Sequence, residues 1–230
     1  MSIAQGIRRL FFILLAVLLL YQCWLFAWVV CWKWVNPRQT SFMSLRLDEM
    51  RQTNPHAELQ RVWLDYGRIS DQLKRAIIAA EDARFVDHDG FDWQGFQQAI
   101  EKNQKKGRFV AGGSTISQQL AKNLFLTPSK TPWRKAQEAV VTLMLEICWD
   151  KERIFEVYLN VIEWGNGVFG AEAAARHYYG VSAAHLSASQ AARLAGMVPN
   201  PRLYDRQRNA PGLARKTAII LARMPAAELP

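Results

Sequence analysis

The chain has 230 residues, of which half are hydrophobic, and its 29 lysine and arginine residues exceed its 20 aspartate and glutamate residues, giving a net charge of +9. The apolar fraction is ample for the core of one domain with an accessory segment, and the three cysteines show no disulfide or metal-site pattern. The positive charge favours a polyanionic partner and leaves nucleic acid, anionic lipid headgroups and a phosphorylated substrate open, beside a plain solubilising surface.

The first predicted element is a membrane-spanning helix. Residues 10–32 contain no charged side chain, and as a helix they would extend about 35 Å, enough to cross a bilayer. Arg8 and Arg9 precede this segment, Lys33 follows it, and tryptophans crowd its second half, as interfacial aromatic residues do. A cleaved signal peptide would have a shorter apolar core and a small-residue cleavage site. We therefore predict that residues 1–35 form a short cytoplasmic tail and an uncleaved anchor.

Residues 36–69 are expected to form an extended connector, because two Asn-Pro pairs break helices there and residues 61–66 have the composition of a short strand. A helical pattern begins at Ser70, which can cap a helix with regularly spaced apolar residues. Further helices are predicted at 92–106, from 115 onward, and at 131–149, 151–160, 171–178, 188–197 and 212–224. The helix at 131–149 is apolar almost all round and is expected at the centre of the domain. Residues 70–230 are predicted to form one mainly α-helical domain.

The sequence Glu-Asp-Ala-Arg-Phe-Val-Asp-His-Asp-Gly, at residues 81–90, is the first candidate for a reactive site. Glu81 ends an apolar helix, where the negative end of the helix dipole and the apolar neighbours both disfavour a charged carboxylate. A glutamate in such a place is a candidate general base with a pKa tuned toward neutral pH. Asp82 is a candidate structural residue that ties down the loop to His88 and Gly90. The alternative is an exposed acidic loop at a helix end.

A second polar cluster surrounds a predicted helix start that follows two glycines, which is a natural place for an anion. Gln118 and Lys122 are four residues apart, so they share one helix face, and Lys122 offers a charge to a phosphate. The lysine comes too late for a nucleotide-binding P-loop. Ordinary helix capping explains Thr115 and Gln118, but it does not explain why Gln119 and Asn123 join the cluster.

A third cluster lies at the start of the most apolar helix. Arg134 and Glu138 are four residues apart and can form a helical ion pair. Glu138 stands at the edge of an otherwise apolar segment, where an unpaired carboxylate is costly, so it needs a cation, a proton or a ligand. Lys151, Tyr158 and Asn160 form a polar set on the next helix, and we interpret them as structural.

Together these clusters resemble the bacterial peptidoglycan glycosyltransferases, a family with a lysozyme-like fold. The family patterns are Glu-Asp-x-x-Phe-x-x-His-x-Gly, Gly-x-Ser-Thr-x-x-Gln-Gln, Arg-Lys-x-x-Glu and Lys-x-x-Ile-x-x-x-Tyr-x-Asn. The chain carries them in that order, at residues 81–90, 112–119, 134–138 and 151–160. A fifth pattern, at residues 190–199, is weaker because it begins with glutamine where the family often has glutamate.

The resemblance implies an enzyme that joins a lipid-linked disaccharide-pentapeptide, lipid II, to a glycan held on undecaprenyl diphosphate, forming β-1,4 bonds with inversion. Glu81 is implied to be the base that deprotonates the acceptor's sugar hydroxyl, and Glu138 a second catalytic carboxylate that positions the donor. No cofactor is required, although a divalent cation, magnesium or manganese, is allowed near Glu138. The residues that the resemblance assigns to substrate binding are Ser114, Thr115, Gln118, Gln119, Lys122, Asn123, Lys130 and Arg134.

The resemblance also sets expectations about location and partners. Larger family members continue into a penicillin-binding transpeptidase domain, whereas this chain has no Ser-x-x-Lys nucleophile motif and looks like the monofunctional, membrane-anchored form. We expect a single-pass protein of the bacterial inner membrane, with a cytoplasmic N-terminus, a periplasmic catalytic domain, lipid-linked substrates, partners among cell-wall synthesis or division proteins, and no nucleic acid. Two rivals stay open: a lytic enzyme of the same fold whose glutamate acts as an acid, and a catalytically silent scaffold.

Overall fold

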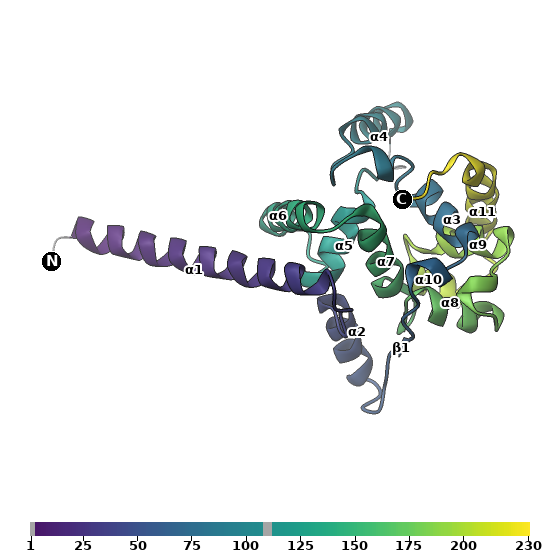
Figure 1. The fold of residues 1–230 in the computed structure, drawn as a ribbon, viewed down its shortest axis with the longest axis horizontal. Coiled ribbons are helices and arrows are strands. Elements are labelled where there is room, and N and C mark those ends of the chain that lie inside the picture. The colour runs from purple at the N-terminus through teal and green to yellow at the C-terminus, as the bar shows by residue number, and fades with distance from the viewer. Residues whose placement is uncertain (1–2, 108–111) are drawn as a thin grey trace.

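The computed structural model describes residues 3–107 and 112–230, which form one long helix and a mainly helical body (Figure 1). The helices are α1 (Ile3–Trp32), α2 (Ser41–Arg51), α3 (Asp71–Glu81), α4 (Trp93–Lys106), α5 (Ile116–Phe125), α6 (Pro132–Cys148), α7 (Lys151–Val161), α8 (Ala171–Tyr179), α9 (Ala188–Met197), α10 (Pro201–Arg206) and α11 (Pro211–Arg223). The strands are β1 (Gln60–Arg61), β2 (Glu163–Gly165) and β3 (Val168–Phe169), and short 3-10 turns lie at Tyr66–Arg68, Phe85–Asp87, Ala183–His185 and Met224–Ala226. The mainly α-helical class predicted from the sequence is confirmed.

The N-terminal helix α1 is long and apolar enough to cross a membrane, by length and composition. It projects away from the body, whose elements gather around its C-terminal end (Figure 1). There Leu25 and Val29 are buried, and Gln22 and Gln137 of α6 exchange two amide hydrogen bonds of 2.9 and 3.0 Å. Trp149 Nε1 donates to the carbonyl oxygen of Val29 (2.8 Å). Because the rest of α1 leaves its apolar side chains exposed, lipid is the surrounding that suits it.

The centre of the body consists of α3, α5, α7 and α9, in which α5 packs on α7, α3 packs on α9, and α11 closes against both α3 and α9. The largest fully buried side chains are Trp164, Tyr158, Phe85, Phe155 and Phe169. Burying aromatic side chains of this size is a main source of stability in a domain. The packed core therefore fixes the positions of the central helices and of the polar residues that they carry.

The connector between α1 and the body is partly helical, so the expectation of an extended segment is wrong over Ser41–Arg51. Thr40 caps α2, because its side-chain oxygen accepts a hydrogen bond from the backbone N–H of Met43 (3.2 Å), and Met43 itself is buried. The two Asn-Pro pairs lie on either side of α2. They bound this helix instead of preventing it.

A small three-stranded sheet, in the order β1-β3-β2, joins the connector to the body. Strand β1 runs parallel to β3, and β2 runs antiparallel to it. The strand expected at 61–66 is shorter and earlier, at Gln60–Arg61. Beyond β1 the backbone of Leu64 pairs with the side chain of Asn160 and not with a neighbouring strand. Asn160 Nδ2 donates to the carbonyl oxygen of Leu64, and the N–H of Leu64 donates to Asn160 Oδ1, each at 2.9 Å. The structural interpretation of Asn160 is thereby confirmed.

Helix α6 lies at the surface, so the expectation that it is buried all round is wrong. Val141 and Leu145 are buried, but Val140, Leu143 and Ile147 are 39, 48 and 80% exposed. Three large apolar residues of α4 are exposed as well: Trp93, Phe96 and Ile100. Because α1 packs on α6, the exposed apolar side of α6 lies beside the candidate membrane span. An all-apolar helix fits a protein core or a lipid-facing surface equally well, and hydrophobicity alone does not separate the two.

Candidate active site

Glu81 is the last residue of α3, and its half-buried carboxylate lies where α3 meets α5. Gln119 of α5 donates a hydrogen bond from Nε2 to Glu81 Oε2 (2.8 Å). Burial raises the pKa of Glu81 above its ordinary value, against the opposing effects of the Gln119 hydrogen bond, Lys216 and Lys122, while Asp82 adds to the rise. The direction is the one predicted from the sequence, and it suits a proton acceptor that works near neutral pH. The role of Glu81 as the base stays a prediction.

Asp82 holds the loop that follows α3 against the start of α5. Its buried carboxylate accepts a hydrogen bond from the backbone N–H of Ile116 (2.9 Å) and lies 3.0 Å from Nε2 of His88. Thr115 Oγ1 donates to the carbonyl oxygen of Gly90 (2.7 Å), which fastens the other end of the loop. The structural interpretation of Asp82 is confirmed, and a loose acidic loop does not describe this segment.

The start of α5 is fixed by the predicted capping box. The N–H of Gln118 donates to Thr115 Oγ1 (3.2 Å), and the N–H of Thr115 donates to Gln118 Oε1 (3.1 Å). Both side chains are buried, and their hydrogen bonds are used in this cap. Asn123 is also buried, and its Nδ2 donates a hydrogen bond to the backbone carbonyl of Gln119 (2.8 Å). Ser114 is exposed just before the helix. Contact of these residues with a substrate stays a prediction.

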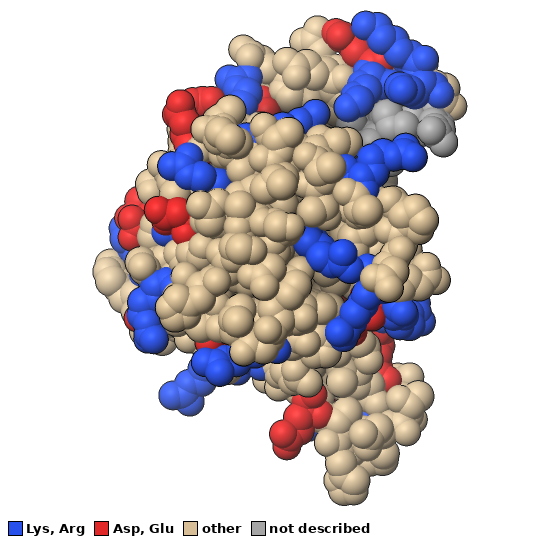
Figure 2. Space-filling model, turned by 90° about the vertical axis from the view of Figure 1, so that its right-hand side faces the viewer, with Lys and Arg blue, Asp and Glu red and all other residues tan. Residues whose placement is uncertain are grey.

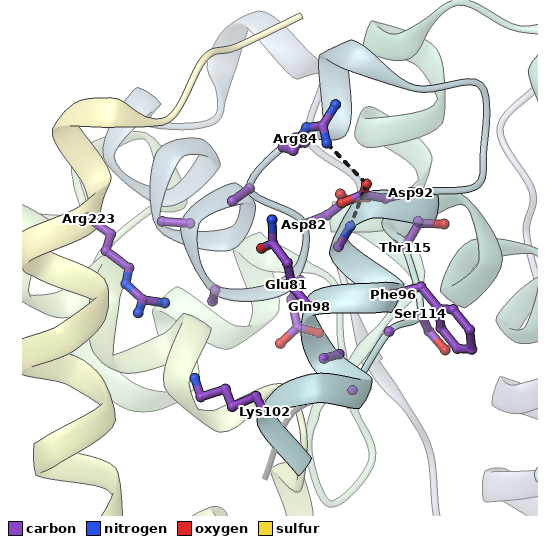
Figure 3. Close-up of a pocket in the computed structure, with 17 residues that line it drawn as sticks. Glu81, Asp82, Arg84, Asp92, Phe96, Gln98, Lys102, Ser114, Thr115 and Arg223 are labelled. Carbon is purple, nitrogen blue, oxygen red and sulfur yellow. Dashed lines mark hydrogen bonds and ion pairs between the residues drawn. The ribbon is translucent and has the colours of Figure 1, made fainter. Parts of the chain in front are cut away.

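A pocket of about 280 Å³ opens beside Glu81, and we call it the Glu81 pocket (Figure 3). It lies between the end of α3, the first turns of α4, the glycine-rich segment before α5, and α11. Lys102 of α4 and Arg223 of α11 extend to one side of it, and Arg84 lies on the other side, 3.5 Å from Asp92 (Figure 3). The Glu81 pocket therefore combines one raised-pKa carboxylate with surrounding positive charge.

A second pocket, of about 260 Å³, is lined by Lys122 and Gln119 of α5, by α2, and by the segment leading into α10; we call it the Lys122 pocket. Gln119 links the two pockets, because it lines this one and donates a hydrogen bond to Glu81, which lines the other. The ammonium of Lys122 lies 5.6 Å from the centre of the Phe42 ring, and burial lowers its pKa. Arg46 and Arg202 also line the pocket. Sequence reasoning missed these two arginines and Phe42, because they come from segments outside the motifs.

Glu138 is buried near the start of α6 and forms ion pairs with Arg134 and Lys135 of the same helix. The predicted pairing of Arg134 with Glu138 is confirmed, and the two cations supply the partner that this buried carboxylate needs. The charges of Glu138 and Arg134 both act on Lys122 through space, although neither residue lines the Lys122 pocket. Lys130 is exposed in the segment before α6.

The divalent cation that the resemblance allows near Glu138 stays a prediction. Within residues 3–107 and 112–230, no group of three His, Cys, Asp or Glu side chains is placed to hold a metal ion. Glu138 already faces Arg134 and Lys135, whereas magnesium and manganese prefer several oxygen ligands. No step of the chemistry below passes through a metal.

Positive charge also extends beyond the two pockets. Figure 2 shows the face turned away from α1, on which lysine and arginine side chains are scattered and gather at the top, where α4 lies. Lys102, Lys105 and Lys106 of α4 line a shallow hollow in that region. The net charge of the chain therefore reflects the whole surface as well as the site.

Tyr158 is the residue whose place in the site differs most from its interpretation in the sequence. It is fully buried on α7, and its hydroxyl donates a hydrogen bond to Gln119 Oε1 (3.0 Å). This contact joins residues 39 positions apart and depends on how α7 packs on α5, so no local pattern predicts it.

A half-buried carboxylate with a raised pKa, placed between two pockets with cationic side chains, is the arrangement expected of an active site. Comparison with known proteins gives the family. The chain belongs to the transglycosylase family, whose model matches residues 48–225.

Curated relatives match almost the whole chain. It is 68% identical to the biosynthetic peptidoglycan transglycosylase of Dechloromonas aromatica (strain RCB) over 228 residues, which are 99% of each chain. Identity to the protein of the same name from Laribacter hongkongensis (strain HLHK9) is 66% over 211 residues, 92% of each chain. Identity to the biosynthetic peptidoglycan transglycosylase of Chromobacterium violaceum is 62% over 217 residues, which are 94% of this chain and 95% of the relative. The resemblance drawn from the motifs is confirmed: the protein is a glycosyltransferase with the family's lysozyme-like fold.

Proposed function

We propose that the protein polymerises the lipid-linked disaccharide-pentapeptide lipid II into β-1,4 glycan strands of peptidoglycan and releases undecaprenyl diphosphate. The family and the names of its relatives support peptidoglycan synthesis. The observation that carries the chemistry is the half-buried carboxylate of Glu81, bound by Gln119 between two pockets lined with cationic residues.

In this proposal Glu81 accepts the proton of the acceptor's sugar 4-hydroxyl while that oxygen attacks the anomeric carbon of the donor. The bond from this carbon to the lipid diphosphate breaks on the opposite face, so an α-linked donor gives a β-linked product. The raised pKa suits this role, because a general base is most effective when its pKa lies near the working pH. The acceptor sugar would occupy the Glu81 pocket.

The leaving lipid diphosphate is already a stabilised anion, so it needs no general acid of the glycosidase kind. It needs positive charge and hydrogen-bond donors where negative charge develops. Lys122 and Arg202 supply that charge in the Lys122 pocket, and the charge of Arg134 acts on Lys122 through space. Glu138 contributes by holding Arg134 and Lys135 in place.

The reaction is proposed to take place at the outer surface of the bacterial inner membrane. Helix α1 would be a single-pass anchor with Arg8 and Arg9 on the cytoplasmic side. The exposed apolar face of α6 lies beside that anchor and would rest against lipid. The lipid tails of donor and acceptor lie in the same layer, so anchor and substrates share one surface.

The test is polymerisation by the purified full chain in detergent with the lipid-linked precursor, followed by sizing of the product with and without muramidase. We expect a muramidase-sensitive polymer that is lost in Glu81→Gln and kept in Glu58→Gln, whose side chain is exposed in the connector. Release of fragments from preformed glycan without polymer would point to a lytic enzyme and overturn the proposal. If both variants still make polymer, Glu81 is not the base.

We also propose that the chain has no transpeptidase activity, since it contains no Ser-x-x-Lys motif. A fluorescent penicillin should leave the folded protein unlabelled, whereas a phosphoglycolipid mimic of the donor should inhibit polymerisation. Stoichiometric labelling by the penicillin would contradict this part of the proposal.

A further inference from the structure

Three central helices place one continuous row of polar groups in the core of the site. Glu81 ends α3, Gln119 lies on α5 and Tyr158 on α7. Tyr158 donates from its hydroxyl to Gln119 Oε1 (3.0 Å), and Gln119 donates from Nε2 to Glu81 Oε2 (2.8 Å). The other carboxylate oxygen, Oε1, has no hydrogen-bond partner among the described residues.

The direction of this row is set by the chemistry of its ends. Burial, with added effects of Glu81 and Asp82, raises the pKa of Tyr158 well above its ordinary value, so its hydroxyl stays protonated. A protonated hydroxyl facing the amide can hold Gln119 Oε1, which turns Nε2 toward Glu81. An amide in the reverse orientation would present an acceptor to an ionised carboxylate, and two acceptors repel.

We propose that Tyr158 is a positioning residue that, through the side-chain amide of Gln119, fixes the hydrogen bond to Glu81 Oε2 and leaves Oε1 as the oxygen that takes the acceptor's proton. This inference rests on the proposed role of Glu81 as the base. Tyr158 itself does not touch the reacting atoms. Its contribution is to keep Gln119 from rotating, because an amide held at both ends presents a fixed donor to the carboxylate.

Other charged groups lie around Glu81 and act on it through space, whereas the amide of Gln119 acts by direct contact. They are Asp82 and Arg84 of the loop after α3, Asp92 before α4, Lys102 of α4, Lys122 of α5, and Lys216 and Arg223 of α11. None of them changes when the hydroxyl of Tyr158 is removed. Tyr158→Phe therefore isolates the contribution of the row.

The expected effect has a definite sign. The Gln119 hydrogen bond lowers the pKa of Glu81 against the larger effect of burial. Without the Tyr158 hydroxyl the amide is free to turn, the hydrogen bond weakens, and the pKa of Glu81 rises further. The base works only when ionised, so activity would be lost at a higher pH as the medium is acidified.

The experiment compares kcat/KM against pH for the full chain in detergent, because this profile reports the ionisation of groups in the free enzyme. In Tyr158→Phe the acidic limb should move up by roughly half to one pH unit, with most activity recovered at alkaline pH. Tyr179→Phe is the matched control, since Tyr179 has a buried hydroxyl without a hydrogen-bond partner in the described part of the chain. Its limb should stay where the wild-type limb lies.

A double variant tests whether the effect passes through the amide. Gln119→Met keeps the length of the side chain but removes the donor, so it should move the limb up at least as far as Tyr158→Phe does. Adding Tyr158→Phe to Gln119→Met should then produce no further shift, because the intermediate group is already absent. If Tyr158→Phe is too unstable for kinetics, Gln119→Met alone still tests the hydrogen bond to Glu81 on which the inference depends.

Several outcomes would overturn the inference. A uniform loss of activity with an unmoved limb in Tyr158→Phe would make Tyr158 merely structural, and additive shifts in the double variant would remove Gln119 as the intermediary. An unmoved limb in Gln119→Met would do the same. These failures are distinct from failure of the proposed function, in which Glu81→Gln itself would retain turnover and the acidic limb.

Discussion

Glu81 and Glu138, the two glutamates that the family resemblance assigns to catalysis, have partners of opposite kinds. Glu81 is hydrogen-bonded by a neutral amide, that of Gln119, whereas Glu138 is ion-paired with Arg134 and Lys135. A neutral donor offsets only part of the cost of burying a charge, so the pKa of Glu81 is raised. Two cations offset that cost by direct ion pairing with Glu138. The difference teaches that a neutral amide leaves part of the cost of burying Glu81 in place, and this remaining cost appears as a raised pKa.

The largest expected effect is that of Glu81→Gln. This change keeps the size of the side chain and removes the proton acceptor, so the rate of polymerisation should fall by at least about 10², the usual contribution of a general base. Initial rates with the lipid-linked precursor measure it, and an unchanged melting temperature shows that the variant is folded. Near-normal turnover in a folded Glu81→Gln protein would end the assignment of the base.

The pH profile should separate the two carboxylates. The wild-type acidic limb is expected above about 4.3, the value of an ordinary glutamate, because the folded pKa of Glu81 is raised. Activity is then present above that pKa and is lost as the pH falls through it. In Glu138→Gln the limb should keep its position, whereas residual activity of Glu81→Gln should lack it. A limb that moved with Glu138 instead would reverse the comparison.

Glu138→Gln should act mainly on binding and stability. Arg134 and Lys135 lose their partner, so the donor's KM should rise several-fold and the free energy of unfolding should fall by roughly 1–3 kcal/mol, while kcat at saturation changes less. Steady-state kinetics and denaturant unfolding give both values. A drop confined to kcat, with KM and stability intact, would assign Glu138 to the chemical step.

The smallest expected effect distinguishes the two cations. The side chain of Lys135 is 51% exposed and that of Arg134 is 16% exposed, so water screens the pair with Lys135 far more. Lys135→Met should change the free energy of unfolding by at most about 0.5 kcal/mol, and Arg134→Met should change it more. Denaturant unfolding of the two variants, side by side, checks the order; equal losses would contradict it.

The features that could be predicted from the sequence are those that depend on a few neighbouring residues. Helix α4 was expected at 92–106 and occupies Trp93–Lys106, and α7 was expected at 151–160 and occupies Lys151–Val161. The capping box of α5 belongs to the same class. Apolar spacing, caps and helix ends act over one or two turns, so they are visible in the sequence.

The features that could not be predicted depend on packing between distant segments. Tyr158 bonds to Gln119 only because α7 packs on α5, and Phe42 reaches Lys122 only because α2 folds back on α5. The exposure of Ile147 escaped prediction for another reason. The composition of a helix indicates that it lies in an apolar environment, but it does not indicate whether that environment is the protein core or lipid.

The joint between α1 and the body determines how substrate meets enzyme. Two amide hydrogen bonds link Gln22 and Gln137, Trp149 holds the carbonyl of Val29, and Arg153 holds that of Trp32 at 2.7 Å. With α1 seated in a bilayer, as proposed, such a joint keeps the Glu81 pocket at a constant height above the lipid. A substrate tethered by its own lipid tail carries its diphosphate at a constant height too. The encounter is thereby reduced from a search in three dimensions to diffusion within a plane.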